Sequence, residues 1–334
     1  MNKLDIKITE LHKQPFKNLQ ASQLVLEFKG NTVYPSVVNA LRRLSLNEVP
    51  TYSFCNDSIL IEENTSIFDN DYMRKRLEQL TVPNVNVPVV LLNDKYWRDV
   101  DYSNLEREKD PNDVIVLDLV INQKNHTDDV FNLTTNDVRL FQDGVDVSDK
   151  FDKNYPILLL KLRKGETFKC SAKAVLGKGF RNNIWAAAAT AYHEYDDKHV
   201  IKFTIESQGQ LDEYDILYRC CKIMKNKIED IKNKLKENFS SSDITKQSYL
   251  RINFDKEDHT FGEVLNEFLQ ENSDVAFSGI SKPDLLKNEI TIKMKSVKNN
   301  PLTPLFDTMD YVIDIYDNIE KSLLSLGKKY ILAK

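Results

Sequence analysis

The sequence contains little cysteine. Only Cys55, Cys170, Cys220 and Cys221 occur among 334 residues. They are too few and too irregularly spaced for a disulfide framework, which indicates a protein of a reducing, intracellular compartment. No CxxC pair occurs, and no set of cysteine and histidine residues has the spacing of zinc ligands. We therefore expect neither a bound metal nor a cofactor.

Long apolar runs are also missing. No run reaches the roughly 18 apolar residues that cross a membrane, and the opening MNKLDIKITELHKQ lacks the apolar core of a secretory signal, so we expect no membrane contact. The 46 Lys and Arg against 51 Asp and Glu give a net charge of −5. This balance argues against a general nucleic-acid coat protein but leaves room for a local basic face.

Most enzyme signatures are absent. The sequence has no GxGxxG, GxxxxGK[ST], HExxH or GxSxG. The nearest relative of a phosphate loop is Gly177-Lys178-Gly179, which lacks the upstream glycine and the following Ser or Thr. A turn at a strand end is the favoured interpretation.

What is present is a weak repeat. Residues 24–44 and 250–270 each begin with the alternation of a strand, continue through a polar break, and end with the spacing of an amphipathic helix. Asp258 or Thr260 could cap the second helix, and Glu263 lies where a capping box with Thr260 would need it.

Each copy also ends in a longer predicted helix, at about 211–238 and about 305–326. Apolar residues recur there at alternating steps of four and three, the spacing of a coiled coil over about three heptads. Two matched seams in one chain favour contact between the helices, although each helix could instead pack only on its own sheet. The seam residues are Leu217, Cys221, Met224, Ile228, Ile231 and Leu235 in the first helix and Leu305, Met309, Val312, Tyr316, Ile319, Leu323 and Leu326 in the second.

The first copy is interrupted. Strand-like runs at 114–121, 157–162 and 167–176, with turn signals between some of them, predict an inserted β-rich domain over 52–197. The first module then comprises residues 1–51 and 198–238. The polar segment 239–247 is interpreted as a linker, and residues 248–334 form a second, smaller module. The fold class predicted is α+β.

Two charged clusters leave other functions open. An acidic row on the second long helix could hold a divalent metal in a nucleic-acid enzyme or meet a basic partner surface, although a solvated helix face is favoured. A basic cluster could serve a free-standing nucleic-acid-binding adaptor, although a solvated strand face is favoured. The lysines of 222–236 likewise read as the wet side of the first long helix. The acidic row is Asp307, Asp310, Asp314 and Asp317, and the basic cluster is Lys161, Arg163, Lys164, Lys169, Lys173, Lys178 and Arg181.

Longer stretches resemble a known family. VNALRRLSLNEVPTYSF (38–54), ILIEENTSIFDNDYMRKRLEQL (59–80), CSAKAVLGKGFRNNIWAAAATAYHEY (170–195) and FTIESQGQL (203–211) are similar to the α-type assembly subunit of cellular RNA polymerases. That family includes the bacterial α N-terminal domain, its archaeal D-type homologue and the third-largest subunit of eukaryotic polymerase II. DHTFGEVLNEFLQENSDVAFSGISKPDLLKNEITIKM (258–294) resembles the smaller partner, the archaeal L-type protein and its eukaryotic counterpart, with Lys-Pro where that family usually has His-Pro.

The resemblance implies a non-catalytic assembly platform of a multisubunit DNA-directed RNA polymerase. The two modules, each an antiparallel sheet with helices, would pair within one chain as a pseudo-heterodimer rather than a homo-oligomer. The implied partners are the largest and second-largest subunits, and further small subunits could also bind. Any contact with DNA would be indirect. By resemblance, Asn39, Arg42 and Arg43 would contact the second-largest subunit, with both arginines facing outward.

Two further expectations follow from the same resemblance. Some family members bind zinc or an iron–sulfur centre through cysteines of the inserted domain, but Cys55 and Cys170 alone cannot, so we expect no metal there. A single fused chain resembles the arrangement in large nucleocytoplasmic DNA viruses. That origin would place the protein in the host cytoplasm or nucleus and in the virion.

Overall fold

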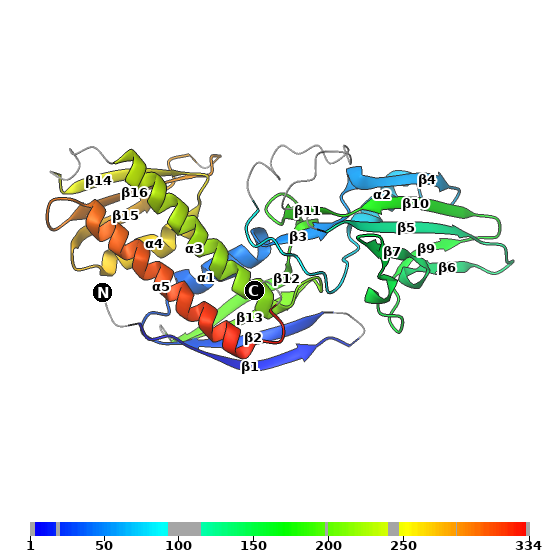
Figure 1. Ribbon diagram of the computed structural model, residues 1–334, viewed down its shortest axis with the longest axis horizontal. Helices are drawn as coiled ribbons and strands as arrows, with labels where there is room; N and C mark the ends of the chain where they lie inside the picture. Colours follow the sequence, from blue (N-terminus) through cyan, green and yellow to red (C-terminus); the bar gives the residue numbers. More distant parts are fainter. Residues whose placement is uncertain are drawn as a thin grey trace.

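The computed structural model describes residues 4–17, 21–92, 115–197, 200–239, 247–284 and 286–331. Figure 1 shows two sheets around a layer of helices at one end of an elongated molecule and a β-rich domain at the other. The predicted α+β class is therefore confirmed. Most of the predicted linker, and part of the predicted insertion, lie outside the described residues.

The first module is a four-stranded antiparallel sheet with two helices. Its strand order is β1-β2-β13-β12. Leu26 and Phe28 of β2 lie opposite Phe203 and Ile201 of β13, and all four side chains are buried on the face that meets the helices. The elements are β1 (Lys7–Pro15), β2 (Ser22–Lys29), α1 (Pro35–Asn47), β12 (Ala188–Asp197), β13 (Val200–Ser207) and α3 (Glu213–Asn238).

This sheet corrects one predicted boundary. The insertion was expected to reach residue 197, but β12 pairs along β13 from Ala188 opposite Ser207 to Asp197 opposite Val200. β12 is an edge strand in the described sheet, and its alanines, tyrosines and charged residues lack the apolar alternation that marks a half-buried strand. The inserted domain therefore ends before Ala188.

The second module repeats the plan with three strands in the order β14-β16-β15. The predicted succession of strand and helix is confirmed in both copies. Asp258 caps α4 by accepting from the Thr260 backbone N–H, whereas Glu263 lies 3.1 Å from the His259 ring instead of completing a capping box. A Cβ on Gly262 would lie 2.2 Å from Ile280 Cδ1, so glycine lets α4 approach its sheet closely. The elements are β14 (Tyr249–Asp255), α4 (His259–Glu271), β15 (Val275–Ser281), β16 (Glu289–Ser296) and α5 (Leu302–Leu326).

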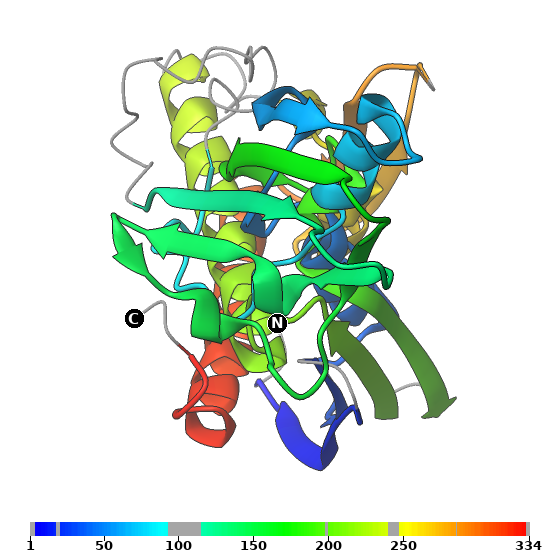
Figure 2. The ribbon, with the colours of Figure 1, turned by 90° about the vertical axis from the view of Figure 1, so that its right-hand side faces the viewer.

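The inserted domain is mainly β, as predicted. Figure 2 looks onto it and shows its strands crossing in front of α3 and α5. A five-stranded sheet has the order β4-β10-β5-β7-β8, β6 pairs with β9, and β3 pairs with β11 where the insertion meets the first module. The elements are β3 (Pro50–Ser53), β4 (Ile59–Asn64), α2 (Asn70–Glu78), β5 (Leu117–Lys124), β6 (Phe131–Thr134), β7 (Arg139–Gln142), β8 (Val145–Asp146), β9 (Leu158–Leu162), β10 (Thr167–Lys173) and β11 (Val175–Lys178).

Gly177 and Gly179 serve close packing rather than phosphate binding. A Cβ on Gly177 would lie 2.5 Å from the Trp185 ring, and one on Gly179 would lie 2.0 Å from the Leu46 carbonyl oxygen at the end of α1. Gly177 thus allows close packing within the insertion, and Gly179 allows the insertion to dock against α1 of the first module.

The two long helices lie side by side between the two sheets (Figure 1). All the predicted seam residues are buried except Ile231, which is half-buried, and Leu326, which is 37% exposed at the end of α5. α3 and α5 are thus in direct contact, while the residue-by-residue assignment of the seam stays a prediction. The buried apolar residues of both modules and of most of the insertion form one continuous core.

Ile228→Asp tests this seam. Ile228 is 2% exposed, and a carboxylate there would be buried without a partner, so we expect the free energy of unfolding to fall by about 3 kcal/mol or more. Asn233→Asp introduces the same charge at an exposed position of α3 and should change stability by less than about 0.5 kcal/mol. Equal thermal midpoints for the two variants would contradict the assignment.

Candidate functional site: the contact between the two modules

Lysines of α3 face carboxylates of α5 along the edge of the seam. Lys222 lies 3.1 Å from Glu320, and Lys225 lies 2.5 Å from Glu320 and also pairs with Asp317. Further along both helices, Lys232 pairs with Asp310. Each step forward on α3 matches an equal step back on α5, as two antiparallel helices require. We call these pairs the charge ladder.

The charge ladder corrects two expectations. The lysines of α3 and the acidic row of α5 are both predicted to face solvent. Instead, Asp310 and Asp317 are engaged by lysines of α3. Within the described part of the chain, only Asp307 and Asp314 of the row are exposed without such an ion pair. Burial alone would lower the pKa of Lys225, but the two carboxylates that it contacts outweigh burial and raise it. The amphipathic pattern predicts which residues are polar but not which polar residues meet another helix.

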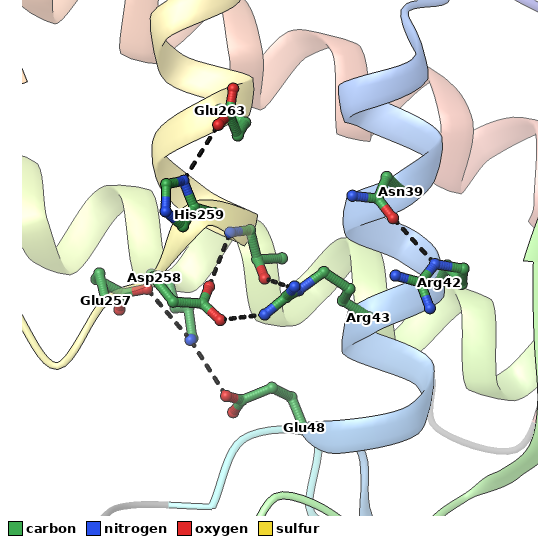
Figure 3. A network of polar contacts seen from close by, with 10 residues as sticks. Asn39, Arg42, Arg43, Glu48, Glu257, Asp258, His259 and Glu263 are labelled. Atoms are coloured by element: carbon green, nitrogen blue, oxygen red, sulfur yellow. Dashed lines mark hydrogen bonds and ion pairs between the residues drawn. The ribbon is translucent and has the colours of Figure 1, made fainter. Parts of the chain in front are cut away.

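A second set of contacts joins α1 to the start of α4. Arg43 Nε donates to Thr260 Oγ1 at 2.6 Å, and Arg43 Nη2 lies 2.5 Å from Asp258 Oδ2 (Figure 3). Although burial opposes the effect, the hydrogen bonds from Thr260 and the Arg43 guanidinium hold the pKa of Asp258 below its usual range. Arg43 thus binds the capping residue of a helix in the other module.

The outward orientation expected for Arg43 is therefore wrong. Adjacent residues of an α-helix point about 100° apart, so Arg42 and Arg43 cannot face the same surface. Arg43 turns toward α4, whereas Arg42 turns away from it (Figure 3).

A partly buried ionic cluster links both modules to the insertion. Lys227 of α3 lies 3.5 Å from Glu48, at the end of α1, and 3.5 Å from Glu257, just before α4. Glu48 also lies 3.0 Å from Lys178 of β11. Burial raises the pKa of Glu257 against the opposing effect of Lys227. Burial alone would lower the pKa of Lys227, but Glu48 and Glu257 raise it. None of these partners was predicted from the sequence, because ion pairs between distant segments leave no local signal.

The cluster borders a cavity of about 450 Å³ between α1, α3, the start of α4 and the insertion. Its lining has equal numbers of basic and acidic side chains, so it favours neither an anion nor a cation. The acidic lining residues are Glu48, Asp230, Asp255, Glu257 and Asp258, and the basic ones are Arg43, Lys178, Lys227, Lys234 and Lys256.

The opposite ends of α1 and α4 also meet. Tyr34, just before α1, donates its hydroxyl to Glu271 at the end of α4. Tyr316 of α5 donates to the Val37 carbonyl oxygen at 3.4 Å. Together with Arg43 at the other end, these contacts fix α1 antiparallel to α4.

Arg42 and Asn39 lie one turn apart on α1 and form a polar pair. Arg42 Nε donates to Asn39 Oδ1 at 2.9 Å, which holds the guanidinium in place (Figure 3). Both residues are half-buried, and no carboxylate within the described ranges pairs with Arg42. Their predicted contact with a large subunit stays a prediction.

The cysteines offer little chemistry. All four are buried and none forms a disulfide. Burial raises the pKa of Cys170 to about 12 and also raises the pKa values of Cys55, Cys220 and Cys221, which keeps the thiols protonated. Within the part of the chain that the structure describes, no group of three or more His, Cys, Asp or Glu could hold a metal ion. The expectation of a metal-free chain stays a prediction.

The basic cluster of 161–181 is not one continuous surface. Lys164 pairs with Asp128, Lys169 with Glu62, and the buried Lys178 with Glu48.

Among the described helices, none is long and apolar enough to span a bilayer.

Comparisons with known proteins match both halves of the chain. Residues 27–228 and residues 249–322 each match a family profile described as the RNA polymerase Rpb3/Rpb11 dimerisation domain. A putative DNA-directed RNA polymerase subunit, R470 of Acanthamoeba polyphaga mimivirus, is 29% identical over 342 aligned positions that cover 95% of this chain and 93% of the relative. The polymerase subunit Rpo3 of Methanocaldococcus jannaschii is 28% identical over 200 aligned positions, which cover 60% of this chain and 85% of the relative. The polymerase II subunit rpb3 of Dictyostelium discoideum is 28% identical over 201 aligned positions, which cover 57% of this chain and 61% of the relative.

The relatives differ in how much of this chain they cover. The mimivirus relative aligns with nearly the whole chain, whereas the archaeal and amoebal subunits align with little more than half of it. The two profile matches fall on either side of the segment between α3 and β14.

A double-mutant cycle tests the contact between Arg43 and Asp258. Asp258→Asn keeps a capping side chain but removes the charge, so Arg43→Ala and Asp258→Asn should each lower stability, by about 1–3 kcal/mol for the arginine. We expect a coupling energy of at least about 0.5 kcal/mol in chemical denaturation. Arg42→Ala is the matched control and should cost less than about 0.5 kcal/mol. Strictly additive effects would show that the two side chains do not interact.

Proposed function

Because the chain belongs to the RNA polymerase Rpb3/Rpb11 dimerisation family, we propose that it is the non-catalytic subunit on which the large subunits of a DNA-directed RNA polymerase assemble. The observation that carries the proposal is the pairing of two family modules, through their helices, within one polypeptide. The protein's work is then the presentation of a rigid surface rather than a chemical step.

Fusion of the modules serves this role. Two modules in one chain meet at an effective concentration near the millimolar range, so their pairing does not depend on an encounter between separate subunits. The charge ladder, the partly buried ionic cluster and the shared core then hold the pair in one arrangement. A large subunit that docks across both modules therefore finds its binding surface already formed, which lowers the entropy cost of assembly.

We further propose that the direct partners are the largest and second-largest subunits. The face formed by Asn39 and Arg42 supports a contact with the second-largest subunit. A half-buried guanidinium that pairs with no described carboxylate is suited to a charge-assisted hydrogen bond across an interface. The place of action would be inside the cell in which the polymerase transcribes. Packaging in a virion stays a prediction.

The alternative of a metal-dependent nucleic-acid enzyme is less well supported. Two of the four carboxylates it would use, Asp310 and Asp317, are held by lysines of α3. A free-standing nucleic-acid adaptor is also less well supported, since three lysines of its basic cluster are engaged by carboxylates.

Co-expression with the two large subunits tests the proposal. Loss of a buried charged contact at an interface costs about 2–5 kcal/mol, so Arg42→Ala should weaken assembly about 30-fold or more, measured as complex recovered on a tagged large subunit. Arg251→Ala, on the exposed face of β14, is the matched control and should assemble normally. Wild-type recovery of the complex with Arg42→Ala would contradict the assigned contact face.

A further inference from the structure

Arg42 lies beside a histidine of the edge strand β12. α1 packs against β12, and His193 lies opposite Phe203 of β13, whose side chain is fully buried on the face toward the helices. His193 thus points inward, beneath α1, although its strand lies at an edge of the described sheet. Its Nδ1 atom is buried and has no hydrogen-bond partner in the described part of the structure.

Among the residues that the structure describes, both groups lack the counterpart that such groups normally have. Nε of Arg42 is satisfied by Asn39, but no described carboxylate lies within ion-pair distance of the guanidinium. A buried polar atom without a hydrogen bond and a half-buried charge without a partner each destabilise the folded chain. Because α1 packs against β12 and the charge of Arg42 acts on His193, the two groups together leave a place for a group that is negatively charged and accepts hydrogen bonds.

The missing group must be anionic and must accept hydrogen bonds. The guanidinium offers donors in a planar fork, and an imidazole protonated at Nδ1 offers one more. A carboxylate has two oxygens that can accept from both at once. A nucleic-acid backbone fits less well, because it is bound by several cations along a track, and the neighbouring Arg43 is already engaged by Asp258.

We propose that Arg42 and His193 form a receptor for one carboxylate, the side chain of an Asp or Glu of a large polymerase subunit. This inference rests on the proposed function and gives the chemistry of the partner group. Tyr195 lies at the open side of the receptor, 64% exposed and with its ring centroid 6.4 Å from that of His193, where it can exclude water around the bound carboxylate.

Such a receptor makes assembly depend on pH. Burial and the neighbouring Arg42 lower the pKa of His193 below 6.5 in the free chain, and Arg42 is the charged group that faces it from α1. A bound carboxylate would offset both effects and raise that pKa, so assembly takes up a proton. Binding therefore tightens as the pH falls through the pKa of the bound state and levels off below the pKa of the free state. Each pKa unit of increase on binding corresponds to at most a tenfold gain in affinity.

His193→Gln, studied in the full chain, tests the receptor through this linkage. Glutamine can still donate a hydrogen bond but cannot be protonated. The affinity for the purified large subunits, measured between pH 8 and pH 5.5, should rise by up to about tenfold for the wild type and remain flatter for the variant. His126→Gln, at an exposed position of the insertion, is the matched control and should follow the wild type. Arg42→Lys keeps the charge but loses the planar fork, and should bind more weakly at every pH.

A second measurement needs no partner. In the free chain, NMR titration of the His193 ring should give a pKa below the ordinary value, and Arg42→Ala should raise it because a neighbouring positive charge is removed. An unchanged pKa in that variant would refute the geometry.

The outcomes separate the receptor from the proposed function. If the wild type binds the large subunits and His193→Gln shows the same affinity and pH profile, the receptor is refuted while the platform role stands. If the wild type fails to bind them at all, both are refuted. Competition for this face by a single-stranded RNA oligonucleotide, lost in Arg42→Ala, would overturn the carboxylate assignment in favour of phosphate.

Discussion

The fold depends on one constraint: α3 carries apolar side chains on more of its circumference than one sheet can cover. Ile216, Cys220 and Ile223 are buried, as are the seam residues Leu217 and Met224, which lie on another side of the same helix. The first module has only one sheet to offer, so the remaining apolar surface needs another partner. α5 of the second module supplies it. Burial of this surface removes apolar area from water and is the main force that brings the halves together.

Charge decides which partner α3 accepts. The charge ladder places lysines on α3 and carboxylates on α5, so pairing of α3 with a second α3 from another copy would bring like charges together. Partly exposed ion pairs add little to stability, but their arrangement favours the mixed pair over the like one. Arg43 and the cluster around Lys227 act similarly at the crossing of α1, α3 and the start of α4. These contacts support an intramolecular pseudo-heterodimer, with the burial of apolar surface as the driving force and polar contacts as the source of register.

Regular periodicity made much of this arrangement predictable. The strand-to-helix repeat, both long helices and nearly all seam residues follow from spacings of two and of three to four residues, which are local properties of the chain. β12 was missed because an edge strand needs no apolar alternation. Arg43 was placed on the wrong side, and Glu48 and Lys227 were not anticipated, because a charged residue on a helix surface looks the same in sequence whether it meets water or another helix.

The most direct test is to express the chain as two polypeptides, residues 1–239 and 247–334. If apolar burial between α3 and α5 holds the modules together, the two pieces will co-purify as a one-to-one complex in size-exclusion chromatography. Ile228→Asp in the first piece will then abolish that complex, whereas Asn233→Asp will not. Recovery of two separately folded, non-associating pieces would contradict the account.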